Sequence, residues 1–333
     1  MITVTELGEH ALLARLLARL PRPSASVLVG PGDDAAVVAT ARNERLVVTT
    51  DAVVEGVHFS RAYSTATDIG HRALAVNLSD LAAMAATPRW ALVSLVLPGS
   101  MQVADVEELV DGMSALATRH GVSVAGGNIT RTDGPLVVDV TAGGEVAPRK
   151  WLTRAGARAG DELWVSGTIG AAAAGLEMLR LAGKGPGAGC VARHKRPEPR
   201  VRLGVAMGRA RAARAAMDLS DGLADAVHQV AAASGVGVRV DAASLPIDDS
   251  AREWWKSRGV DAVTAAIAGG DDYELLFAVP AKGAGRLRAV RRQVATPALT
   301  KIGVFTKDAH ERVLLKDGSE DVIPQGFEHF ANR

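Results

Sequence analysis

Four segments of the chain place aspartates beside glycines or hydroxyl residues, next to apolar runs. Within 333 residues their sequences are GPGDDAAVV (30–38), VVTTDAVVEGVHF (47–59), MDLSDGLADAV (217–227) and GGDDYELLFAVP (269–280). Carboxylates held close together repel each other unless a cation neutralises them, and Mg²⁺ takes oxygen ligands of this kind. Asp and Gly are also ordinary turn residues. The pattern therefore indicates either a metal site or a set of turns.

Asp80 lies in a segment that is apolar on nearly every side. The sequence ALAVNLSDLAAMAA (73–86) predicts a helix on which Asn77 shares a face with Asp80. A carboxylate in such a helix must be paired, protonated or bound to a metal. The alternative is that Asp80 caps the start of a second helix.

Polar groups also gather at the start of the helix predicted after MDLSD. Asp218, Ser220 and Asp221 stand there together, and the free amides of a helix start can bind an anion. An N-cap role for the Asp or Ser side chains is the alternative. The segment AGGN (125–128) would allow a phosphate to approach the backbone closely, and Arg154 is either a phosphate partner or a surface arginine.

Composition and missing motifs exclude several classes of protein. There is no GxxxxGK[ST] loop, no protein-kinase signature set, no HExxH and no GxSxG. A net charge of +1 and an aromatic content of 4% argue against nucleic-acid and membrane-surface binding. The single cysteine, Cys190, allows no disulfide within the chain, and no apolar run reaches membrane-spanning length. We expect a soluble cytoplasmic protein.

The elements that must position these groups follow no regular alternation of strand and helix. Their periodicity predicts helices at 7–20, 68–86, 103–120, 171–181, 201–216, 221–234 and 284–294. It predicts strands at 45–50, 90–97, 122–128, 136–146, 162–166, 238–240 and 275–279. Because strands come in pairs before helices, the pattern favours an α+β arrangement over a doubly wound parallel sheet.

A change of character near residue 150 predicts two domains, 1–150 and 151–333. Within the second, GKGPGAG (183–189) is predicted to be a loop, and RHKRPEPR (193–200) a basic connector broken by prolines. In the first, Asp68 is predicted to cap the helix that leads to Asp80.

Taken together, these segments resemble the thiamine-monophosphate kinases, whose superfamily includes aminoimidazole ribonucleotide synthetase, selenophosphate synthetase and a hydrogenase maturation protein. The matching stretches cover nearly the whole chain in the family's order: GPGDDAAVV, TTDAVVEGVHF, ALAVNLSDLAAMAATPRWALVSLVLP, AGGNITR, LTRAGARAGDELWVSG, MDLSDGLADAV, GGDDYELLFAVP and GFEHF. The resemblance implies an α/β fold of two domains. Residues 1–150 would bind Mg-ATP and form a homodimer, and residues 151–333 would complete the nucleotide and substrate site.

The resemblance also implies roles for individual residues. Several Mg²⁺ ions would be bound by Asp34, Thr49, Thr50, Asp51, Asp80, Asp218 and Asp221. ATP would lie along Gly127, Asn128, Arg154 and Ser220, and thiamine monophosphate near His58, Asp271 and Phe327. Two positions depart from the family's commonest pattern, which has Asp at Asn128 and Glu at Asp271. Asn128 would contact metal or phosphate, and Asp272 would be able to share the substrate contact of Asp271.

The implied reaction converts ATP and thiamine monophosphate into ADP and thiamine diphosphate. The acceptor phosphate has a second pKa of about 6, so it needs no strong general base at neutral pH. Mg²⁺ ions bridging aspartates to phosphates would overcome the repulsion between two anionic substrates, and we expect direct in-line transfer.

Two alternatives remain open at this point. One is another ATP-using enzyme of the superfamily, similar to aminoimidazole ribonucleotide synthetase, against which GGDDYELLF and GFEHF favour the kinase. The other is a non-catalytic nucleotide-binding regulator, for which Asn128 and Asp271 would be the supporting features.

Overall fold

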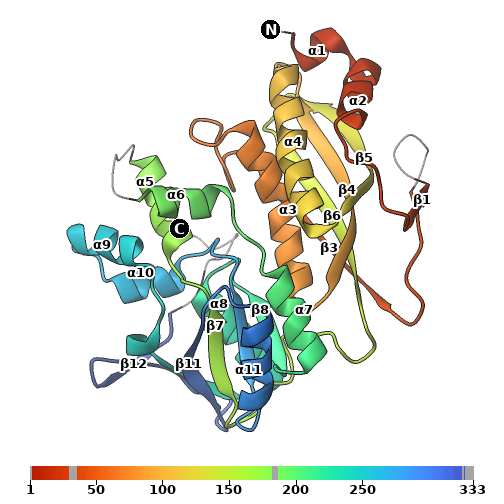
Figure 1. Ribbon diagram of the computed structural model, residues 1–333. Helices are drawn as coiled ribbons and strands as arrows, with labels where there is room; N and C mark the ends of the chain where they lie inside the picture. Colours follow the sequence, from red (N-terminus) through yellow and green to blue (C-terminus); the bar gives the residue numbers. More distant parts are fainter. Residues whose placement is uncertain (1, 30–35, 182–186, 325, 327–333) are drawn as a thin grey trace. The chain divides into compact units, whose positions relative to one another are not determined.

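The computed structural model describes residues 2–29, 36–181, 187–324 and 326 (Figure 1). The chain divides into two compact units. The first unit comprises Met1–Leu81 and Ala86–Pro148, and the second comprises Ala82–Ala85 and Arg149–Arg333. Both combine sheets with helices, and the α+β class is confirmed.

The first unit is built on a four-stranded sheet in the order β3-β6-β4-β5. Its strands are β3 (Arg45–Val54), β4 (Thr87–Pro98), β5 (Ser123–Thr132) and β6 (Val137–Val146). Only the β4–β5 pair is parallel; β6 runs antiparallel to both β3 and β4. A small hairpin of β1 (Val27–Val29) and β2 (Val37–Val38) accompanies the sheet.

Two long helices of the first unit, α3 (Ala66–Ala83) and α4 (Val103–His120), lie side by side against the sheet (Figure 1). Glycines allow their backbones to approach closely, since a Cβ at Gly70 would lie 1.8 Å from the Leu109 carbonyl oxygen. A Cβ at Gly112 would likewise lie 2.1 Å from the carbonyl oxygen of Thr67. Thr65 and Asp68 exchange reciprocal hydrogen bonds at the start of α3, so Thr65 holds the cap position that was predicted for Asp68.

The N-terminal segment forms two short helices where one was predicted at 7–20. They are α1 (Val4–Leu7) and α2 (Glu9–Leu17), and Gly8 between them has a φ of 81° that favours glycine. Arg15 and Arg19 of this segment pair with Glu107 on α4. The break at Gly8 therefore redirects the chain so that α2 packs on α4.

The second unit is built on a seven-stranded sheet in the order β13-β12-β9-β11-β7-β10-β8. Its strands are β7 (Glu162–Ser166), β8 (Ala215–Asp218), β9 (Gly237–Asp241), β10 (Leu275–Val279), β11 (Leu299–Thr306), β12 (Arg312–Lys316) and β13 (Ser319–Val322). All neighbouring pairs are antiparallel except β9 and β12. The apolar core lies where this sheet meets its helices.

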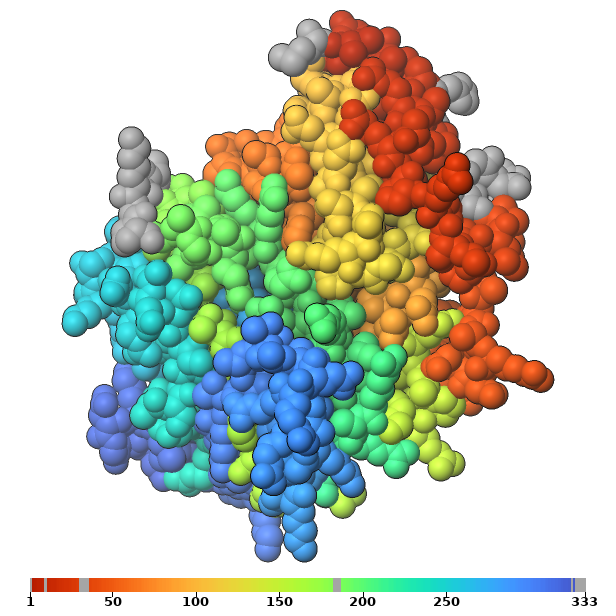
Figure 2. Space-filling view, in the orientation of Figure 1, coloured from red at the N-terminus to blue at the C-terminus, as the bar shows by residue number. Residues whose placement is uncertain are grey.

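The helices of the second unit are α5 (Ala171–Arg180), α6 (Ala188–Lys195), α7 (Val201–Ala210), α8 (Leu223–Ser234), α9 (Asp249–Ser257), α10 (Ala262–Ala268) and α11 (Ala284–Gln293), with a 3₁₀ turn at Ala242–Ser244. The surfaces of α7 and α11 lie beside each other (Figure 2). Within the described ranges, no helix is long and apolar enough to cross a membrane.

Two sequence predictions in the second unit were wrong. The helix predicted at 201–216 ends at Ala210, after which Arg211 adopts a left-handed φ of 50° and β8 begins at Ala215. Pairing with β10 overrides the helical propensity of these alanines. The segment predicted to be a connector, 193–200, begins inside the last turn of α6. Two of its residues, Arg193 and Arg200, donate hydrogen bonds to the buried Glu274.

Candidate functional site

A pair of oxygen ligands in the first unit connects β3 to α3. The Thr49 hydroxyl donates a hydrogen bond to the carboxylate of Asp80. Side chains alternate along a strand, so Asp51 lies on the same sheet face as Thr49. Because α3 runs unbroken through Asp80, the alternative that this residue caps a second helix is wrong. The carboxylate instead faces a strand that carries further oxygen donors.

Thr50 lies on the opposite face of the same sheet. Its hydroxyl is within hydrogen-bond distance of Asp139 Oδ1 (3.2 Å), the Val140 carbonyl (3.3 Å) and Thr141 Oγ1 (3.0 Å). The structure therefore groups Thr49 with Asp80 and separates the Thr50 side chain from them. Asp34, the remaining metal candidate of this unit, lies outside the described residues.

His58 has a defined ring orientation. Its Nδ1 accepts a hydrogen bond of 3.1 Å from the backbone N–H of Val54, which leaves Nε2 as the protonated nitrogen of the neutral ring. The next residue, Phe59, is buried and anchors the turn. This hydrogen bond from the end of β3 therefore fixes the orientation of the imidazole ring.

Gly127 and Asn128 line a cavity of about 810 Å³ in the first unit. Its walls include Asp139, Thr141 and four leucines of the N-terminal segment, at positions 13, 16, 17 and 20. A Cβ at Gly127 would lie 2.0 Å from the carbonyl oxygen of Val93, so packing of β5 on β4 requires a glycine here. Asn128 is exposed and can reach a ligand.

Two turns of the second unit pack backbone to backbone. The amide of Asp271 donates to the carbonyl of Ser220 (2.7 Å), and the amide of Tyr273 donates to the carbonyl of Leu219 (3.0 Å). A Cβ at Gly270 would lie 2.6 Å from the Ser220 carbonyl oxygen. The close approach places Ser220 and its neighbours Asp218 and Asp221 beside Asp271. The structure thus brings together four of the candidates in this unit.

The start of α8 has no side-chain cap. Gly222, with a φ of 96°, occupies the cap position, and neither Ser220 nor Asp221 caps the helix. The N-cap interpretation of these residues is therefore wrong. The amides of the first turn of α8 remain suited to an anion, as the sequence predicted.

Arg154 lies against α8. Its guanidinium donates to the side chain of Gln229, which in turn donates to Asp225 at 2.6 Å. A Cβ at Gly326 would lie 2.4 Å from Cβ of Asp225, so the described end of the chain reaches the same region of α8. Phe327, which follows, lies outside the described residues.

Asp271 has an unusual backbone conformation. Its φ is 69°, and that of Tyr273 is 50°; left-handed conformations of this kind cost about 1–3 kcal/mol and recur at functional sites. The Asp271 carboxylate lies 3.6 Å from Nδ1 of the buried His194 and 3.3 Å from the Tyr273 hydroxyl. The side chain keeps partial exposure, so it can meet a ligand.

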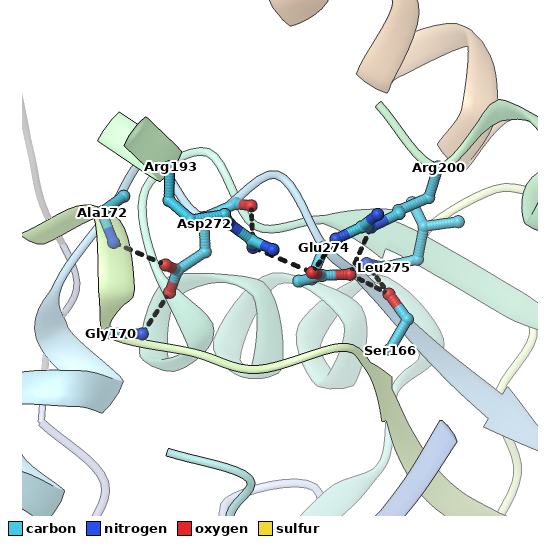
Figure 3. A network of polar contacts seen from close by, with 8 residues as sticks. All are labelled: Ser166, Gly170, Ala172, Arg193, Arg200, Asp272, Glu274 and Leu275. Carbon is cyan, nitrogen blue, oxygen red and sulfur yellow. Dashed lines mark hydrogen bonds and ion pairs between the residues drawn. The ribbon is translucent and has the colours of Figure 1, made fainter. Parts of the chain in front are cut away.

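Asp272 is buried, and its carboxylate points toward Gly170 and Ala172 (Figure 3). Its two oxygens accept hydrogen bonds from the amides of Gly170 (2.6 Å) and Ala172 (3.2 Å) at the start of α5. Burial raises the pKa of Asp272 to about 7, although these hydrogen bonds and nearby Arg193 act in the opposite direction. Asp272 therefore holds α5 in place and cannot share the substrate contact of Asp271.

Glu274 is fully buried and is held by two arginines (Figure 3). Its carboxylate accepts from Arg193 Nη2 (2.9 Å), Arg200 Nε (2.7 Å) and the Ser166 hydroxyl (2.6 Å). Arg193 also donates to the Asp272 carbonyl at 3.1 Å. We call Glu274, Arg193, Arg200 and Ser166 the Glu274 network. Sequence reasoning missed it, although a glutamate inside the apolar run YELLFAVP was a signal that buried cations must accompany it.

The donor set suits Mg²⁺, since it consists of carboxylate and hydroxyl oxygens, which hard cations prefer. Within the described ranges, however, no three His, Cys, Asp or Glu side chains gather closely enough to hold a metal.

Two family models match the chain. AIR synthase related protein, N-terminal domain, matches residues 32–146, and AIR synthase related protein, C-terminal domain, matches residues 158–316. These matches define the class of protein as one that joins the two AIR synthase related domains in a single chain.

Relatives that align with nearly the whole chain identify one family within this class. The thiamine-monophosphate kinase of Escherichia coli K12 is 37% identical over 332 residues, which cover 97% of this chain and 98% of the relative. The crystal structure of thiamine-monophosphate kinase from Stenotrophomonas maltophilia K279a matches with a TM-score of 0.78 and 42% identity, covering 89% of this chain and 93% of that one. AaThiL complexed with AMPPCP and TMP matches with a TM-score of 0.76 and 32% identity over 99% of both chains. This chain belongs to the thiamine-monophosphate kinase family, which confirms the resemblance found in its motifs.

Proposed function

We propose that this chain transfers the γ-phosphoryl group of ATP to thiamine monophosphate, forming thiamine diphosphate and ADP. The observation that carries the proposal is the likeness over nearly the whole chain to thiamine-monophosphate kinases, together with AaThiL complexed with AMPPCP and TMP. The acceptor phosphate, with a second pKa of about 6, is mostly deprotonated at neutral pH. The residues therefore need to position and neutralise two anions rather than remove a proton.

Mg²⁺ is the cation that the oxygen donors fit. In the first unit Thr49, Asp51 and Asp80 would hold it, and in the second unit Asp218 and Asp221 would do so. Bound Mg²⁺ neutralises phosphate charge and aligns the reacting groups. Thr50 is left out of this set because its hydroxyl lies on the other sheet face. Transfer is direct and in line, without a phosphorylated enzyme.

The remaining residues divide between the two substrates. Gly127 and Asn128 in the first unit, and Ser220 and Arg154 in the second, would contact ATP. The exposure of Asn128 and the uncapped start of α8 beside Ser220 support this assignment. His58 and Asp271 would contact thiamine monophosphate, with the Asp271 carboxylate facing the cationic end of thiamine.

A homodimer formed by the first unit is part of the proposal. Leu46 and Val48 lie on the sheet face opposite Thr49 and are 49% and 52% exposed. Apolar side chains on an uncovered sheet face are typical of a protein interface. A second copy would shield them from water.

The direct test is an assay of the purified protein with ATP, thiamine monophosphate and Mg²⁺. We expect thiamine diphosphate to form, and formation to stop when Mg²⁺ is removed. Acid quenching during turnover should trap no phosphorylated protein. Binding of ATP without any turnover would instead support a nucleotide-binding regulator.

Replacing Asp271 with asparagine should raise the KM for thiamine monophosphate by about tenfold or more while leaving the KM for ATP within about twofold. The reason is that a hydrogen bond or ion contact to a charged group is worth about 1.5–3 kcal/mol. Asparagine tolerates the left-handed backbone of this position, so the turn should remain intact. Steady-state kinetics with each substrate varied in turn provide the measurement.

The matched control is Asp317→Asn. Asp317 also has a left-handed φ, of 50°, but lies in the turn between β12 and β13. This variant should leave both KM values unchanged. Equal increases in both KM values for Asp271→Asn would contradict the assignment of Asp271 to thiamine monophosphate.

A further inference from the structure

A second cavity, of about 440 Å³, lies in the second unit and is lined by none of the residues assigned above. Three segments form it: Arg149–Leu152 at the start of the unit, residues 208–214 at the end of α7, and residues 280–286 at the start of α11. Six of the lining side chains are cationic, and none is acidic: Arg149, Lys150, Arg211, Arg214, Lys282 and Arg286. The whole chain carries a net charge of only +1, so this concentration of positive charge is local.

Among the described residues, only one of these six cations forms an ion pair with a carboxylate. Arg214 pairs with the Asp161 carboxylate at 3.3 Å. Within the described part of the chain, Lys150 and Arg286 donate only to backbone carbonyls, those of Arg209 (2.7 Å) and Arg211 (3.1 Å). The side chains of Arg149, Arg211 and Lys282 make no hydrogen bond or ion pair with any described residue. Cations gathered in this way create a positive potential that attracts anions.

The backbone supports a role for these arginines beyond solubility. Arg149 and Arg211 both have left-handed conformations, with φ values of 62° and 50°. Arg211 follows the last residue of α7, at a position where glycine is the least strained choice. The fold thus carries a long cationic side chain where a smaller residue would fit the backbone better, and such strain recurs at functional sites.

The size and chemistry of the cavity restrict its ligand. A volume of about 440 Å³ is in the range of small-molecule sites. Guanidinium groups match the geometry of phosphate oxygens, and the number of cations exceeds what one phosphate group requires. We propose that this cavity, which we call the basic pocket, binds a small anion that carries several linked phosphate groups.

Titration calorimetry tests this proposal by measuring the affinity of the protein for sodium tripolyphosphate in metal-free buffer of low ionic strength. Inorganic phosphate is the second probe. The wild-type protein should bind tripolyphosphate at least tenfold more tightly than inorganic phosphate. The variant Arg211→Gly/Lys282→Ala should bind tripolyphosphate at least tenfold more weakly than wild type. Because glycine relieves the backbone at position 211, its thermal unfolding midpoint should not fall, so loss of folding would not be mistaken for loss of the pocket.

The matched control is Arg288→Ala/Arg292→Ala. Both arginines are exposed on α11 and do not line the basic pocket, so this variant loses the same charge while keeping the site. Its affinity for tripolyphosphate should stay within twofold of wild type. Absence of binding to wild type, unchanged binding after Arg211→Gly/Lys282→Ala, or an equal loss in both double variants would overturn the proposal. No turnover is needed, so the result is independent of the proposed kinase function.

Discussion

Replacing Asp218 with alanine should lower the rate of thiamine diphosphate formation by about a thousandfold or more. Asp218 is the last residue of β8, is buried, and is paired in register with Leu275, beside the turn that carries Asp271. If its carboxylate helps to hold Mg²⁺, alanine removes the ligand while the backbone pairing of β8 persists. Asp80→Ala should have an effect of the same order, because Asp80 is the corresponding carboxylate of the first unit.

The measurement is turnover at saturating ATP, thiamine monophosphate and Mg²⁺, with the unfolding midpoint recorded for each variant. Asp249→Ala is the control, since Asp249 is an exposed aspartate in the first turn of α9. It should keep wild-type turnover. Activity near the wild-type value in Asp218→Ala or Asp80→Ala would exclude the metal role of that residue. Asp218→Asn should additionally require more Mg²⁺ if an amide oxygen partly replaces the carboxylate.

Replacing Glu274 with glutamine should destabilise the second unit by about 3–5 kcal/mol. Glutamine keeps the shape of the side chain but removes the charge that neutralises Arg193 and Arg200 in a fully buried position. Two cations then remain in the interior without their counter-charge, which is the costly outcome of breaking a buried ion pair. Since Leu275 also donates to Ser166 at 2.9 Å, the register of β10 beside β7 should loosen with the network.

Urea unfolding followed by tryptophan fluorescence provides the measurement, because four of the five tryptophans, at positions 151, 164, 254 and 255, belong to the second unit. Glu162→Gln is the matched control. Glu162 lies on β7 of the same sheet and pairs with Lys301 at 2.7 Å near the surface. Exposed pairs contribute about 0–1 kcal/mol, so this variant should change stability little. A loss below about 1 kcal/mol for Glu274→Gln would show that water screens the network.

The local sequence pattern was sufficient to predict the bounds of several helices and strands. The bounds predicted for α4 and for the strands β7 and β10 match the structure. These segments have a clear period or a short apolar run, and their ends carry strong signals such as Gly121, which terminates α4 in a left-handed conformation. Such features depend on neighbouring residues only, so a sequence displays them directly.

The sequence displayed the residue types of the candidate site more clearly than it displayed which of those residues lie together. The separation of Thr50 from Thr49 and Asp51 follows from the alternation of side chains along β3, and the sequence therefore contained that signal. The apolar run around Glu274 indicated that cations would accompany it, but no local signal identified those cations or the partners of Asp272. Asp272 holds the start of α5 from 102 residues away in the chain, and Glu274 meets Arg193 and Arg200 across separations of 81 and 74 residues.

The amino-acid sequence by itself determined the oxygen-rich motifs, their order along the chain and the family to which they belong. Only the tertiary structure decided which of two neighbouring aspartates keeps solvent exposure and which is buried, as with Asp271 and Asp272. It also decided that Ala215–Asp218 is a strand and that six cations from three segments share one pocket. The physical reason is that charge neutralisation, strand pairing and burial act between residues that meet only when the chain has folded.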